Sequence, residues 1–125
     1  KFPENWLTLH PTCHHNYEKL EELFKTFAET PSRFGKAEMF YLWGHSYEFD
    51  NNDNWNVIEE FAQKVSDKDD IWYATNIEIH DYVQAYKRLV FSADSHRVYN
   101  PSVREVWFEV DGKLCSIKPD ETICI

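Results

Sequence analysis

Two histidine-rich segments hold the side chains of this sequence that are best suited to chemistry. Four of the six histidines lie in residues 10–15 and 44–50. His45 is the strongest catalytic candidate, because an imidazole exchanges protons near neutral pH. Gly44, just before it, allows backbone or substrate to approach closely. A structural histidine that hydrogen-bonds its own loop explains this position equally well.

The first segment has the residue types of a metal site, since His10, His14 and His15 surround Cys13. Pro11 prevents the helical i, i+4 geometry that would align two imidazoles. Hydrogen bonds to carboxylates or carbonyls of the turn explain the group better than a metal does. We therefore assign no metal ligand here and expect His14 and His15 to contact a substrate.

Aromatic and acidic side chains accompany His45. Trp43 and Tyr47 can stack on sugar rings, whereas Trp55 is expected to pack at the start of a helix. The same loop carries three carboxylates, on Glu48, Asp50 and Asp53. They suit general bases or cation ligands, although a solvated acidic loop is the commoner case. Of the three, Glu48 is expected to contact substrate.

Alternating strand and helix patterns position these loops. Apolar runs predict strands at residues 6–9, 39–43 and 71–74, with residues 44–54 as a surface loop. Apolar positions at helical spacing predict helices over residues 16–28, 57–65 and 75–89, with Asn16 and either Thr75 or Asn76 as N-caps and Thr30 to Ser32 ending the first helix. The β-α-β-α-β-α order is typical of parallel strands with right-handed crossovers.

The period changes after residue 90. Residues 105–110 alternate between apolar and exposed positions, Asp111-Gly112 predicts a hairpin turn, and residues 114–117 return as a strand. Residues 122–125 can add a last strand. The chain therefore reads as an α/β fold: residues 1–89 form a β-α-β-α-β-α barrel portion, and residues 90–125 form an antiparallel appendage within one structural unit.

Composition excludes several classes of protein. The chain has 125 residues, 13 basic against 22 acidic, and a net charge of −9, which argues against nucleic-acid binding. No window approaches the ~20 apolar residues of a membrane span, and 17% aromatic residues exclude a disordered chain. Three cysteines without a Cys-x-x-Cys pair favour a reducing, cytoplasmic location over an extracellular one.

Three parallel strands cannot close a barrel. Either the chain forms an oligomer, or it belongs to a larger barrel whose N-terminal half is missing here. The sequence begins Lys1-Phe2-Pro3 without an initiator Met, which favours the second interpretation.

The chain resembles the C-terminal part of bacterial members of the polysaccharide deacetylase family. The matching stretches are Pro11-Thr12-Cys13-His14-His15, Phe40-Tyr41-Leu42-Trp43-Gly44-His45-Ser46-Tyr47-Glu48-Phe49, Asp70-Ile71-Trp72-Tyr73-Ala74-Thr75-Asn76-Ile77 and Tyr99-Asn100-Pro101-Ser102. The resemblance implies a distorted (β/α) barrel that hydrolyses an acetamide C–N bond of a carbohydrate. It also implies a zinc-like divalent metal that activates water, and a late histidine, here His45, that protonates the leaving amine.

Two departures qualify the resemblance. The late motif is normally Leu-x-His, whereas Leu42-Trp43-Gly44-His45 is one residue longer. The early Asp-Asp motif and the His-x-x-x-His pair have no counterpart in their N-terminal place. His10 and His14 have that spacing in the wrong order, so the implied metal ligands are not carried by this chain.

Two functions are therefore expected as alternatives. The first is a portion of a metal-dependent, deacetylase-like hydrolase, active if the metal motifs are supplied elsewhere, with His45 as proton donor. The second is a non-catalytic domain that binds carbohydrate or completes a barrel through the same aromatic side chains.

Overall fold

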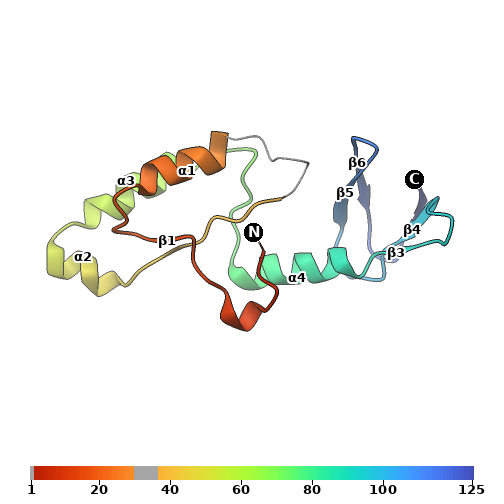
Figure 1. The fold of residues 1–125 in the computed structure, drawn as a ribbon, viewed down its shortest axis with the longest axis horizontal. Coiled ribbons are helices and arrows are strands. Elements are labelled where there is room, and N and C mark those ends of the chain that lie inside the picture. The colour runs from red at the N-terminus through yellow and green to blue at the C-terminus, as the bar shows by residue number, and fades with distance from the viewer. Residues whose placement is uncertain (1, 30–36) are drawn as a thin grey trace. The chain divides into compact units, whose positions relative to one another are not determined.

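The computed structural model describes residues 2–29 and 37–125, which form a mixed α/β fold (Figure 1). Its elements divide into two compact units, residues 1–72 and 73–125. The sequence placed the change of pattern at residue 90, whereas in the structure the last helix belongs to the same unit as the C-terminal strands. The predicted helix stop at residues 30–32 lies outside the described residues.

The first unit contains a β-α-β arrangement. Its elements are η1 (Trp6–Thr8), β1 (Cys13–His14), α1 (Leu20–Glu29), β2 (Leu42–Trp43), α2 (Ser46–Asn52) and α3 (Trp55–Val65). β1 and β2 pair in parallel with α1 between them, as expected for parallel neighbours, which need a long crossover.

Aromatic rings hold α1 and α3 together. Phe24 of α1 packs edge-on against Phe61 of α3 and against Phe40, with ring centroids 5.5 and 5.4 Å apart. Leu20 and Phe61 are buried, whereas the opposite face of α1 carries exposed charges. The predicted apolar stripe of the first helix is thereby confirmed.

The second unit consists of one helix and five strands. They are α4 (Asn76–Lys87), β3 (Val90–Phe91), β4 (Arg97–Tyr99), β5 (Val106–Val110), β6 (Lys113–Ile117) and β7 (Thr122–Cys124). One antiparallel sheet has the order β3-β4-β7, and β5 and β6 form a hairpin. The core contains Ala85, Val98, Val106, Phe108 and Ile117. The predicted third helix, the Asp111-Gly112 turn and the alternation along β5 are confirmed.

Several predicted elements are wrong. The strand predicted at residues 6–9 is a 3₁₀ turn over Trp6–Thr8, which the Asn5 side chain caps by accepting a hydrogen bond from the backbone N–H of Leu7. Residues 71–74 join no sheet, and the strand before α1 lies at Cys13–His14. The described residues form only two- and three-stranded sheets and no closed barrel.

The cysteines and the helices add two findings. Cys13, Cys115 and Cys124 are all free thiols, and Cys124 is exposed. Among the described residues, no helix has the length and apolar character needed to cross a membrane.

Candidate functional site

Pairing of β1 with β2 brings the two histidine-rich segments together. His14 lies opposite Trp43 in the parallel register, and the backbone N–H of His15 donates to the carbonyl of Trp43 at 2.9 Å. Both strands end at the same edge, where their C-terminal loops meet. The predicted site residues His14, His15, Trp43, His45, Tyr47 and Glu48 therefore gather at one place in the first unit.

The Glu48 carboxylate lies at the centre of this group. Its Oε2 atom lies 3.1 Å from Nε2 of His14, 3.0 Å from Nε2 of His15 and 3.4 Å from Nδ1 of His45. The same oxygen accepts a hydrogen bond of 2.9 Å from the backbone N–H of His45. This N–H first, and then the side chains of His15 and His14, lower the pKa of Glu48 to about 2. Glu48 is therefore ionised at neutral pH and is a poor general base.

Residues 44–54 were predicted to be a loop, but Ser46–Asn52 form α2. His45 is the N-cap of this short helix, and Glu48 reaches back from the third helical position to the His45 backbone. This is half of a capping box. The sequence did not predict this helix start, because histidine is not a favoured N-cap residue.

His15 is buried against the backbone of Gly44. The imidazole is 6% exposed, and a Cβ atom at position 44 would lie 2.1 Å from its Cδ2 atom. Phe49 covers the ring on another side, with centroids 4.3 Å apart. No side chain larger than that of glycine fits at position 44. This agrees with the predicted close approach to Gly44, but the group that approaches it is the His15 ring.

His14 is oriented by Asn16. The Nδ1 atom of His14 lies 2.6 Å from Oδ1 of Asn16, and the Asn16 backbone N–H lies 3.3 Å from the same nitrogen. Both contacts hold Nδ1 toward Asn16, so the other ring nitrogen, Nε2, faces Glu48. Asn16 was predicted to be a helix N-cap, but α1 begins at Leu20.

His45 presents the accessible imidazole of the site. Its side chain is 48% exposed, it stacks on Tyr47 with ring centroids 5.0 Å apart, and Trp43 meets it edge-on at 5.5 Å. Trp43 and Tyr47 are themselves 43% and 56% exposed. An imidazole between two accessible aromatic rings suits contact with the C–H face of a sugar.

The remaining candidates lie outside this group. His10 is exposed and is absent from the set of converging donor atoms. Asp50 accepts a hydrogen bond of 2.8 Å from the Trp55 indole, so both belong to the packing of α2 on α3. Asp53 ends α2 in a left-handed conformation with a φ of 48°. These carboxylates have structural roles.

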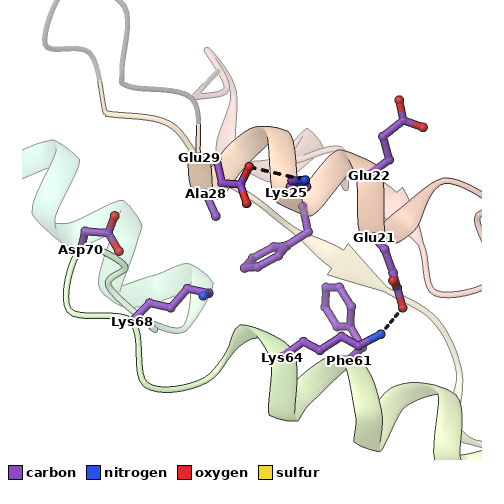
Figure 2. Close-up of a pocket in the computed structure, with 10 residues that line it drawn as sticks. Glu21, Glu22, Lys25, Ala28, Glu29, Phe61, Lys64, Lys68 and Asp70 are labelled. Carbon is purple, nitrogen blue, oxygen red and sulfur yellow. Dashed lines mark hydrogen bonds and ion pairs between the residues drawn. The ribbon is translucent and has the colours of Figure 1, made fainter.

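A hollow lies between α1 and α3 in the same unit (Figure 2). Glu21 pairs with Lys64 across it, and Lys25 pairs with Glu29 along α1 at 3.8 Å. Its described lining carries no histidine, cysteine or hydroxyl group. Its polar side chains are carboxylates and lysines, and the two ion pairs give four of them a structural role.

Comparison of the chain with protein-family models, with curated proteins and with solved structures gives no match. Any functional assignment must therefore rest on the geometry of the cluster formed by His14, His15, His45 and Glu48. It offers an ionised carboxylate, two imidazoles turned toward it, and a third imidazole that a ligand can reach.

Proposed function

We propose that the chain is part of a hydrolase of the polysaccharide deacetylase type, which cleaves an acetamide C–N bond of a carbohydrate. The observation that carries this proposal is the half-exposed His45 imidazole between the accessible rings of Trp43 and Tyr47. The resemblance adds the rest of a distorted (β/α) barrel, since residues 2–29 and 37–125 form no closed barrel.

In this proposal the aromatic rings bind the sugar and His45 moves a proton. Trp43 and Tyr47 present apolar faces to the C–H groups of a sugar ring, and this fixes the acetamide beside His45. The imidazole then donates a proton to the nitrogen that leaves as an amine. Glu48 supports this step by holding the His45 backbone through its 2.9 Å hydrogen bond.

The metal that the resemblance implies would activate the attacking water. The His10 and His14 pair, which has the family's spacing, does not fit this role, because His10 is exposed and does not converge with the other donors. The ionised Glu48 does not suit the role of base either. Of the groups that the proposed reaction requires, these residues therefore support the proton donor, His45.

Acetate release from an N-acetylglucosamine oligosaccharide tests the proposal. The enzyme is the longest natural chain that contains these residues, with and without His45→Ala. Turnover is expected to fall by roughly 10²–10⁴-fold. His96→Ala is the matched control, since His96 is an exposed histidine of the other unit. Near-normal turnover of His45→Ala in a folded protein would overturn the role of His45.

A non-catalytic carbohydrate-binding domain is the second candidate, favoured by the low pKa of Glu48, which makes this carboxylate a poor base. It predicts that the oligosaccharide binds, that Trp43→Ala abolishes binding, and that no acetate is released. Binding of this kind without turnover overturns the hydrolase proposal.

A further inference from the structure

Among the described residues, one group of side chains brings three metal-ligating atoms together. Nε2 of His14, Nε2 of His15 and a carboxylate oxygen of Glu48 all lie within 4.8 Å of one another. We propose that these three side chains bind a divalent metal ion of the zinc class. The set differs from the ligands that the family resemblance implies. It shares His14 and His15 with the histidine group singled out in the sequence, and Glu48 takes the place of His10.

The distances between the donors suit a small tetrahedral ion. Glu48 Oε2 lies 3.1 Å from Nε2 of His14 and 3.0 Å from Nε2 of His15. Zinc bonds of about 2.0–2.1 Å place tetrahedral ligands roughly 3.3 Å apart. Two edges of the ligand triangle are thus within a few tenths of an ångström of the required length, and rotation of the partly exposed His14 ring can close the third.

Asn16 orients the His14 ring. Its Oδ1 atom lies 2.6 Å from Nδ1 and its backbone N–H lies 3.3 Å from the same nitrogen, so that Nε2 faces the Glu48 oxygen at 3.1 Å. A positive charge between Nε2 and the carboxylate, from a metal ion or from a ring proton, stabilises this contact. A hydrogen bond from Nδ1 to a carbonyl oxygen is also the usual outer contact that orients a ligating histidine.

The backbone geometry supports a built site. Neighbouring residues of an extended strand point to opposite faces, yet His14 and His15 are consecutive and both reach the same oxygen. The chain leaves β1 after His14, and the absence of a side chain at Gly44 makes room for the buried His15 ring. The buried His15 ring is therefore held in place before an ion arrives.

The donor types select the kind of ion. Two imidazoles and one carboxylate suit Zn²⁺ and similar transition metals, whereas Mg²⁺ and Ca²⁺ prefer oxygen ligands throughout. Three protein ligands leave further coordination positions open for water or a substrate group. A proton on an imidazole is the competing source of positive charge, and metal titration separates the two.

Calorimetric titration of the chain with Zn²⁺ tests the site, and the absorption spectrum of bound Co²⁺ reports its coordination. We expect one ion per chain, about 100-fold weaker binding for His14→Ala and for Glu48→Gln, and unchanged binding for His10→Ala and His96→Ala. Removal of a direct ligand should cost at least as much as the 10–100-fold loss typical of outer contacts. Circular dichroism identifies any variant that does not fold.

Asn16→Leu provides the sharpest variant, because it leaves all three ligands in place. It is expected to weaken Zn²⁺ binding by about 10–100-fold without unfolding the chain. No Zn²⁺ binding at micromolar concentrations, or binding that His10→Ala weakens as much as His14→Ala, overturns the proposal. The titration uses no sugar and no turnover, so its result is independent of whether the chain belongs to a hydrolase.

Discussion

Substitution of Gly44 by alanine should displace the buried His15 ring. The new Cβ atom would lie 2.1 Å from Cδ2 and 3.1 Å from both Cγ and Nε2 of His15. Carbon atoms pack at about 3.5–4.0 Å, so the ring must retreat by about 1.5 Å. The φ angle of Gly44 lies outside the left-handed region. An alanine therefore adds no backbone strain, and the whole cost is steric.

The surroundings of His15 determine the size of this cost. The ring is 6% exposed and packs between His14 and Phe49, with centroids 4.2 and 4.3 Å away. Overpacking in such a place costs about 1–3 kcal/mol, and loss of the 3.0 Å contact with Glu48 adds about 1 kcal/mol. We expect the free energy of unfolding of the first unit to fall by about 3 kcal/mol.

Urea unfolding followed by tryptophan fluorescence measures this change. Four of the five tryptophans belong to the first unit, namely Trp6, Trp43, Trp55 and Trp72. Gly112→Ala is the control, since nothing lies within 4 Å of its added Cβ and its φ of 76° makes the cost purely conformational. It should cost about 1–2 kcal/mol, in the second unit only.

A double variant tests the reasoning directly. In a His15→Ala background the obstructing ring is gone, so Gly44→Ala should cost less than about 0.5 kcal/mol. An equal cost in both backgrounds would refute the steric explanation. A cost within 0.5 kcal/mol of zero in the wild-type background would show that His15 is not packed against Gly44.

Four further outcomes are expected. Asn100→Ala should cost at least about 3 kcal/mol in denaturant unfolding followed by circular dichroism, because the fully buried amide donates to three backbone carbonyls; a loss below 1 kcal/mol would contradict this. Thr75→Ala should cost about 1 kcal/mol by loss of the α4 cap. Hydrogen bonds from the N–H and hydroxyl of Thr75 lower the pKa of Glu78. The stability that ionised Glu78 provides is therefore present above its unfolded pKa of about 4.3 and is lost as the pH falls through the lower pKa of the folded state. In a plot of stability against pH, Glu78→Gln should flatten this acidic region, and an unchanged plot would refute the role of Glu78. With Ellman's reagent, the exposed Cys124 should react faster than Cys13, whose pKa burial raises; the reverse order would contradict the structure.

Elements with strong local patterns could be predicted from the sequence. The Thr75 cap with Glu78 three residues later, and the helix that follows, need only neighbouring residues to form. The Asp111-Gly112 turn is equally local, since the two residues adopt φ angles of 49° and 76° that suit a tight hairpin. Apolar alternation on either side then determines the face of β5 that is buried.

Other elements depended on partners distant in the sequence. α2 contains residues that favour turns, and its first turn is tied through Glu48 to His14 and His15, 34 and 33 residues away. The apolar run at residues 71–74 predicted a strand, but it finds no partner among the sheets of the described residues. An apolar strand pattern indicates only that a segment is compatible with a sheet. Whether it pairs with another strand depends on the tertiary structure.

By itself, the sequence determined which side chains are of types suited to chemistry: the histidines of two segments, the aromatic pair beside His45 and an acidic loop. The tertiary structure decided how they combine. Parallel pairing of two-residue strands placed Glu48 against His14 and His15, left His10 outside, and changed the role of Asn16 from helix cap to partner of an imidazole. The spacing of residues along the chain does not determine which of these side chains meet. Their donor atoms converge because of the register between β1 and β2 and because Gly44, which has no side chain, leaves room for His15.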